Sequence, residues 1–469
     1  MTNTLPSPSG TNQRPKRTGR ESAVGLQRHK RTATDIGLAL LTPLLGQEFL
    51  DRRGLRDPLN RGLRNGVQTV FSAIGGSARQ FNRVQRLGKP ATRLKPSGAD
   101  YFDLTPDDEQ KMIVETISEF AEEILRPAAH DADAAATYPP ELIAKAAELG
   151  ITAVNVPEDF DGIAAHRSTV TNALVAEALA YGDMGLALPI LAPGGVASAL
   201  THWGSASQQA TYLPEFAGEN VPQACVAIAE PHALFDPTAL KTVATRTPGG
   251  YRLTGVKSLV PAAADAELFV IAAQLNGKAT LFVVEAGSAG LSVKADPSMG
   301  IRGAALGQVE LVDVAVPLHN RLGEDETSEA DHAHNYSEAI ALARLGWAAL
   351  AVGTSHAVLD YVIPYVKERE AFGEPIARRQ SVAFMCANIA IELDGLRLIT
   401  WRGAARAEQG LSFAREAALA KKFGTDKAMQ IGLDGVQLLG GHGFTKEHPV
   451  ERWYRDLRAL GVAEGVVVL

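Results

Sequence analysis

The chain has 469 residues, of which 46% are hydrophobic and 21% charged, and this composition is ordinary for a folded protein of several domains. It contains two cysteines, Cys225 and Cys386, which exclude a disulfide framework and a multi-cysteine metal site and indicate a reducing, cytoplasmic compartment. The formal charge of -7 is unevenly divided, because residues 1–99 carry about +13 and residues 100–469 about -20. A mildly acidic body argues against nucleic acid as the main ligand.

The basic extension, residues 1–99, differs in composition from the rest of the chain. Residues 1–33 are rich in Ser, Thr, Pro, Gly, Lys and Arg, which predicts disorder. The apolar run at 36–50 is too short and interrupted to span a membrane. Across 36–90, arginines alternate with apolar residues in a basic amphipathic pattern, the latter including Val67, Val70, Phe71 and Ile74. Three interpretations stay open: peripheral membrane contact, packing on the protein's own body, and a cleaved targeting peptide.

A helical domain is expected over residues 100–222. Thr105 and Pro106 precede two acidic residues, an order that predicts a helix start with Thr105 as the N-cap. Apolar residues then recur at helical spacing, which indicates one buried face, at Ile113, Ile117, Phe120 and Ile124.

The apolar period changes to two at about residue 223, which predicts a β domain over 223–328. Strands are expected at 268–271, 281–284, 308–311 and 313–316, with a hairpin turn at 248–250.

Residues 329–469 are expected to be helical. Three long helices are predicted at 337–370, 382–408 and 413–439, and Pro364 should kink the first of them.

Several motifs in the second half of the chain form an ordered series. Arg369 opens the sequence Arg-Glu-Ala-Phe-Gly-Glu-Pro-Ile, and Gln380 follows it. Gln437 stands three residues before the glycine pair Gly440 and Gly441, and a Glu-Gly pair at 464–465 follows an Arg-Asp pair at 455–456. A Glu-Gly pair alone carries little information, since most such pairs are solvated turns.

In this order and spacing, residues 100–469 resemble the acyl-CoA dehydrogenase family. The resemblance implies an α+β multidomain fold: an N-terminal helical domain, a middle β-barrel-like domain and a C-terminal four-helix bundle. It also implies FAD between the β domain and the bundle, an acyl-CoA substrate, and electron transfer to an electron-transfer flavoprotein.

The resemblance assigns the catalytic base to Glu464. A glutamate that acts near neutral pH needs a raised pKa, and the apolar neighbours Leu460, Val462, Ala463 and Val466–Val468 should provide a dry setting. The alternative is an ordinary surface glutamate. Some family members carry the base immediately before a helix arginine that is matched here by Arg344, but this chain has Ala343 at that place.

The remaining site residues are also implied by the resemblance. Arg344 is assigned to substrate binding, with a structural salt bridge as the alternative. The flavin's phosphates and adenine should be held partly by a neighbouring subunit, which implies a dimer or tetramer. The residues assigned to this cofactor binding are Arg369, Phe372, Gln380, Gln437, Gly440 and Gly441.

The chain departs from the family pattern where the β domain should contact the flavin ring. Ala229, Phe235, Pro261 and Val466 stand where the family has hydroxyl residues, and proline also lacks an N–H donor. Three hypotheses explain this: a mixed oligomer with a related subunit, weaker flavin binding through backbone groups, and a non-catalytic scaffold. The sequence favours an acyl-CoA dehydrogenase, with a flavin-poor partner or structural subunit as the alternative.

Overall fold

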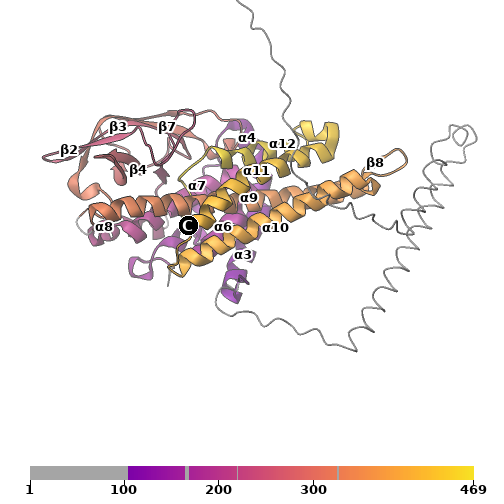
Figure 1. The fold of residues 1–469 in the computed structure, drawn as a ribbon, viewed down its shortest axis with the longest axis horizontal. Helices are drawn as coiled ribbons and strands as arrows, with labels where there is room; N and C mark the ends of the chain where they lie inside the picture. Colours follow the sequence, from indigo (N-terminus) through magenta and orange to yellow (C-terminus); the bar gives the residue numbers. More distant parts are fainter. Residues whose placement is uncertain (1–103, 164–167, 219, 325–326) are drawn as a thin grey trace, which may run out of the picture. The chain divides into compact units, whose positions relative to one another are not determined.

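The computed structural model describes residues 104–163, 168–218, 220–324 and 327–469. The predictions for residues 1–99, including membrane contact through 36–90, lie outside the described residues. The described chain follows the predicted order, with helices first, then a sheet, then long helices (Figure 1).

The first helices form one face of the core. The predicted helix start lies two residues later than expected, because Asp107 is the N-cap and forms a capping box with Gln110. A carboxylate accepts the free N–H of the first turn better than Thr105 could from two residues upstream. The α-helices are α3 (Asp108–Phe120), α4 (Arg126–Ala135), α5 (Leu142–Glu148), α6 (Thr169–Gly182), α7 (Met184–Trp203) and α8 (Ala206–Ala217), and a π-helical turn, η1 (Ala121–Leu125), joins the first two.

The middle domain is one seven-stranded sheet in the order β1-β4-β2-β3-β7-β6, with β5 paired to β4. The expected hairpin is confirmed, since β2 and β3 pair antiparallel across the turn at 248–249. The two strands expected at 308–316 form the single strand β7, which pairs with β3 through shifts in register. The strands are β1 (Ala224–Ala227), β2 (Val243–Thr247), β3 (Gly250–Val260), β4 (Leu268–Leu275), β5 (Lys278–Glu285), β6 (Leu291–Ala295) and β7 (Gly307–Pro317).

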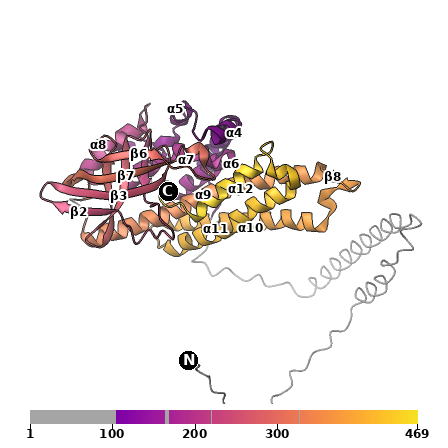
Figure 2. The ribbon, with the colours of Figure 1, turned by 90° about the horizontal axis from the view of Figure 1, so that it is seen from above.

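The C-terminal helices pack around α9 (Glu329–Glu368), which passes beneath the sheet domain and continues to the far end of the bundle (Figures 1 and 2). Pro364 lies inside this helix, four residues before its end, where it leaves the Asp360 carbonyl without its helical N–H donor. A short hairpin of β8 (Glu370–Ala371) and β9 (Glu374–Pro375) connects α9 to the next helix. The bundle is completed by α10 (Gln380–Glu408), α11 (Ala414–Leu439) and α12 (Val450–Leu457).

Two helices of the described chain, α7 and α9, are long and apolar enough to cross a membrane. Their apolar windows are 89% and 83% buried inside the protein. We therefore interpret both as core helices rather than membrane spans.

Candidate active site

Glu464 lies at the junction between the bundle and the sheet domain, and its side chain is 8% exposed. Arg344 on α9 donates to both carboxylate oxygens, with Nη2 3.0 Å from Oε1 and Nε 3.2 Å from each oxygen. Lys421 on α11 places its Nζ 3.5 Å from Oε1. The structure therefore brings Glu464 and Arg344 together, as an ion pair with a second cation beside it.

The turn that carries Glu464 is bonded to β1 on one side and to α9 on the other. The Val466 N–H donates to the Val226 carbonyl at 3.0 Å, so Gly465 forms a bridge with Ala227 of β1. Trp347 of α9 donates its indole N–H to the Gly465 carbonyl at 2.9 Å. Gly465 has φ +81°, a conformation that glycine adopts without steric cost.

The expected dry, apolar setting for Glu464 holds for most of the backbone around it but not for its carboxylate. Leu460, Ala463 and the residues after Gly465 are buried, whereas Val462 is exposed. The carboxylate itself contacts two cations, because a buried anion is stable only when charges or hydrogen bonds replace water. For Arg344 the structure shows the salt bridge; its role in substrate binding stays a prediction.

Tyr336, two helical turns before Arg344, connects this cluster to the loop after β1. Its hydroxyl donates to the Pro237 carbonyl at 2.6 Å. Burial raises the pKa of Tyr336, and the negative charges of Glu464 and Glu230 raise it further. Tyr336 is therefore bonded to the loop after β1 and lies close enough to Glu464 for its pKa to respond to that charge.

That loop is anchored by a buried ion pair. Lys257 on β3 donates to Glu230 at 2.9 Å, and Glu230 also accepts the N–H groups of Lys241 and Thr242. Burial alone would raise the pKa of Glu230, but the Lys257 charge and these backbone donors bring it down to about 2. Burial lowers the pKa of Lys257 to about 8, against the pull of Glu230. The pair fixes the loop in place.

The departures from the family pattern lie on and near this loop. Ala229 is buried and Phe235 packs edge-on against His232, with ring centroids 5.5 Å apart. Pro261 is buried directly after β3. None of these three side chains can donate a hydrogen bond to a flavin ring.

The six predicted cofactor residues come from the end of α9, the β8–β9 hairpin (Figure 1), the start of α10 and the end of α11 with the glycine turn after it. Tyr365, in the last turn of α9, donates to the Leu439 carbonyl at 3.4 Å, which ties the segment before Arg369 to the glycine turn. Phe372 is 95% exposed, and the Arg379 guanidinium lies 5.6 Å from its ring centroid. The other five are also exposed: Arg369, Gln380, Gln437, Gly440 and Gly441.

These groups fit the anionic half of a dinucleotide cofactor. A Cβ added at Gly440 or Gly441 would meet nothing within 4 Å, so the backbone of this turn is open to a ligand. Exposed arginines beside an open glycine turn can hold a pyrophosphate through charge and backbone contacts. The exposed groups at the end of the bundle therefore fit the anionic part of FAD. On the loop after β1, the structure offers a flavin ring few side-chain donors.

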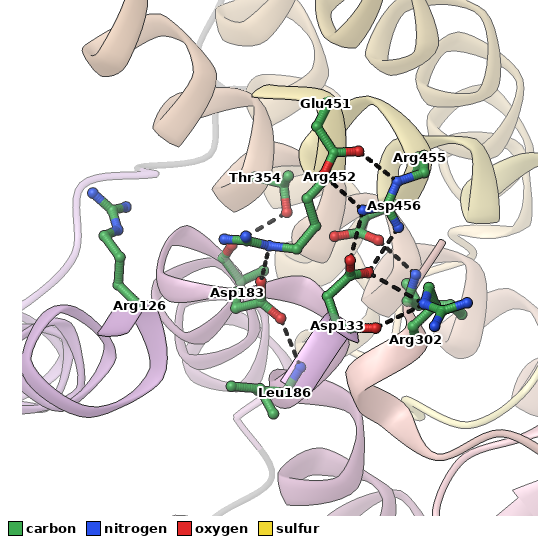
Figure 3. Close-up of polar contacts among 12 residues, drawn as sticks. Arg126, Asp133, Asp183, Leu186, Arg302, Thr354, Glu451, Arg452, Arg455 and Asp456 are labelled. Atoms are coloured by element: carbon green, nitrogen blue, oxygen red, sulfur yellow. Dashed lines mark hydrogen bonds and ion pairs between the residues drawn. The ribbon is translucent and has the colours of Figure 1, made fainter. Parts of the chain in front are cut away.

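A second ionic cluster joins the helical domains and contains residues that sequence reasoning missed (Figure 3). Arg452 on α12 donates to Asp183, the N-cap of α7, at 2.9 Å, and both side chains are buried. Arg455 binds both oxygens of Asp133 on α4 at 2.7 and 2.8 Å and also contacts Glu451. This network attaches α12 to the N-terminal helices.

Lys421 was missed although the sequence carries a signal for it. On α11 the small residues Ala417, Ala420 and Gly424 are buried at helical spacing, and Lys421 falls on the same stripe. A lysine within a buried stripe requires an anionic or carbonyl partner. This pattern predicts a lysine with an anionic or carbonyl partner, but it does not identify which carboxylate that partner is.

Comparison with known proteins places these features in a family. Models of the acyl-CoA dehydrogenase N-terminal, middle and C-terminal domains match residues 107–220, 225–314 and 334–466. The short/branched chain specific acyl-CoA dehydrogenase of Bos taurus is 31% identical, over 76% of this chain and 83% of its own length.

Solved structures agree with this assignment. Butyryl-CoA dehydrogenase from Megasphaera elsdenii has a TM-score of 0.70 and 28% identity, covering 78% of this chain and 96% of its own. A chain in the structure of an electron transferring flavoprotein of Acidaminococcus fermentans has a TM-score of 0.71 and 29% identity, covering 78% and 96%.

A buried carboxylate beside a sheet domain, together with an exposed end suited to an anionic cofactor, defines a three-domain oxidoreductase of the flavoprotein class. The three matching domain models and the Bos taurus relative make the assignment specific. The chain belongs to the acyl-CoA dehydrogenase family.

Proposed function

We propose that this protein oxidises an acyl-CoA thioester to the 2,3-enoyl-CoA, with Glu464 as the base. The observation that supports the proposal is the placement of Glu464: a buried carboxylate on a turn bonded to β1 and α9, where the sheet domain meets the bundle. Two of the relatives named above are a short/branched chain specific acyl-CoA dehydrogenase and a butyryl-CoA dehydrogenase, so short acyl groups are the first substrates to test.

The reaction removes two hydrogens from the acyl chain. Glu464 takes the proton from the α-carbon, and FAD, when bound, supplies the acceptor for the hydride that leaves the β-carbon. Arg344 holds the carboxylate by a bidentate contact, so its orientation is defined before substrate arrives. Buried surroundings exclude water from the carboxylate, which limits competing proton exchange.

The cofactor would be held mainly at the bundle end, by Arg369, Gln380, Gln437 and the open turn at Gly440 and Gly441. Because these groups are exposed in a single chain, a second subunit is expected to complete the site. An electron-transfer flavoprotein is proposed as the electron acceptor, on the strength of the structural relative from Acidaminococcus fermentans.

The test is to purify the full chain, measure its FAD content from the flavin absorbance, and assay butanoyl- to octanoyl-CoA with an artificial electron acceptor. We expect a yellow protein that forms enoyl-CoA and loses this activity in Glu464→Gln. A colourless protein that stays inactive after FAD is added would contradict the proposal.

A second candidate is supported by the missing donors at Ala229, Phe235 and Pro261. In this alternative the chain is a flavin-poor subunit that lends its exposed bundle end to a related partner with a complete ring pocket. Co-expression with such a relative, followed by measurement of flavin per chain, separates the two. Flavin bound only in the mixed oligomer would support the alternative, and flavin bound equally by the chain alone would exclude it.

A further inference from the structure

Lys421 is a buried cation for which neither the family motifs nor the comparisons give a role. It lies near the start of α11 on the stripe that faces the core, and 15% of its side chain is exposed. Its neighbour Lys422 points outward, is 73% exposed and pairs with Asp426 one turn later. Two consecutive lysines therefore occupy opposite environments, and the buried one requires an explanation.

The Lys421 ammonium group makes two contacts, and both concern the turn that carries the base. Nζ donates to the Ala463 carbonyl at 2.6 Å, directly before Glu464. The same Nζ lies 3.5 Å from Glu464 Oε1. The ammonium group of Lys421 thus contacts both the backbone just before the turn and the Glu464 carboxylate.

We propose that Lys421 is a positioning residue for Glu464: it fixes the Ala463–Glu464 backbone and, together with Arg344, sets the orientation of the carboxylate. This inference rests on the proposed function. Arg344 approaches from α9 and Lys421 from α11, so the carboxylate is held between two helices. Arg344 contacts both carboxylate oxygens from one helix, and Lys421 adds a contact from a second helix and holds the backbone of the turn.

The charged and titratable groups that face the cluster define its behaviour with pH. They are Arg344 and Tyr336 on α9, Lys421 on α11, and Glu230 and Asp236 on the loop after β1, which act on Tyr336 and Arg344. Burial lowers the pKa of Lys421, while the charge of Glu464 raises it and that of Arg344 lowers it. Lys421 should therefore lose its proton below the pH at which an exposed lysine does, near 10.4.

The first experiment reads this coupling without any need for activity. NMR of the purified full chain with isotope-labelled lysine, in which the Lys421 signal is identified by its loss in Lys421→Arg, gives the pH at which Lys421 titrates. Glu464→Gln removes the partner charge and should shift this titration to lower pH, while the control Asp426→Asn should leave it unchanged. An unchanged Lys421 titration in Glu464→Gln would overturn the proposal, whether or not the chain oxidises acyl-CoA.

The second experiment uses the holoenzyme with butanoyl-CoA. Lys421→Met should lower kcat about 10- to 100-fold with little change in KM, because the base is misplaced while the substrate contacts stay intact. Lys421→Arg should restore most of the kcat and extend activity to higher pH, since a guanidinium does not lose its proton there. The matched control, Lys422→Met, should behave as wild type.

Thermal melting separates misfolding from misplacement. If Lys421→Met melts far below wild type, Lys421→Arg at alkaline pH is the deciding variant. Two results would contradict a positioning role. One is a loss of activity at alkaline pH that is identical in wild type and Lys421→Arg. The other is a folded Lys421→Met whose kcat equals that of Lys422→Met.

Discussion

Two ionic clusters share one stretch of chain, residues 451–464, which contributes members to both, and they differ in how their charges balance. In the network of Figure 3, the carboxyl groups of Asp133, Asp183, Glu451 and Asp456 lie with the cations Arg302, Arg452 and Arg455, and Lys446 lies at the rim, so acidic and basic groups are equal in number. Around Glu464 one carboxylate faces two cations, Arg344 and Lys421.

This difference in charge balance corresponds to a difference in role: the first cluster attaches helices to one another, and the second holds the proposed base. The first network joins α12 to α4 and α7, and its Asp183 also caps α7 through the Leu186 N–H at 3.0 Å. A network of this kind holds elements together, and breaking it leaves a buried charge without a partner. The second cluster concentrates positive charge at one carboxylate that has to accept and release a proton.

The largest expected effect is on catalysis by Glu464. Glu464→Gln keeps the size and the hydrogen-bonding oxygen but removes the base, so kcat should fall by about 10²- to 10⁴-fold. Initial rates of enoyl-CoA formation measure this. If the rates were unchanged in a folded variant, Glu464 would not be the base, and the two clusters would not differ in function.

The next effect concerns stability. Arg452→Met leaves Asp183 buried without its cation, so the free energy of unfolding should fall by about 3–5 kcal/mol. Chemical denaturation followed by circular dichroism measures it. If Arg452→Met were no less stable than wild type, the first network could not be described as an attachment.

A pH effect distinguishes the clusters further. Burial raises the pKa of Asp456 to about 8, with the nearby Asp183 charge adding to the rise. Because the same group titrates near pH 4 when unfolded, the unfolded chain binds fewer protons in this window, and stability should fall as pH rises from about 4 to about 8.

Asp456→Asn should flatten this slope by at most about 1.4 kcal/mol per pH unit, while keeping an acceptor for the Ile301 N–H. Denaturation curves at several pH values provide the measurement. Parallel slopes in wild type and variant would show that Asp456 is ionised throughout.

The smallest effect lies at the rim of the first network. Lys446 contacts Asp133 at 3.6 Å but is 62% exposed, so Lys446→Met should change the free energy of unfolding by less than about 1 kcal/mol. A loss as large as that of Arg452→Met would mean that the rim, rather than the buried pairs, carries the attachment.

Much of the fold could be predicted from the sequence because periodicity and turn residues are local signals. The order of helices, sheet and helices follows from the change in apolar period, and the turn at 248–249 follows from its proline and glycine. The helix start was misplaced because Thr105 and Asp107 are both good caps, and the capping box with Gln110 decides between them.

The site was predictable in part. Glu464 and Arg344 were both selected, and the structure places them in contact, but their pairing joins residues 120 positions apart. The expected apolar setting does not extend to the carboxylate, because sequence neighbours describe the backbone around Glu464, while its carboxylate contacts α9 and α11. Arg452 and Asp183 gave no local signal of their pairing, since each appears in its own helix as an ordinary polar residue.

The hydrogen bonds from Val466 to β1 and from Trp347 to Gly465 make the carboxylate's turn a seam between two domains. Because the turn is hydrogen-bonded to both domains, a movement of the sheet relative to the helices would also move Glu464. An indole at this seam also supplies an optical probe: the part of the fluorescence that comes from Trp347, one of four tryptophans, should report movement of the base before any chemistry occurs.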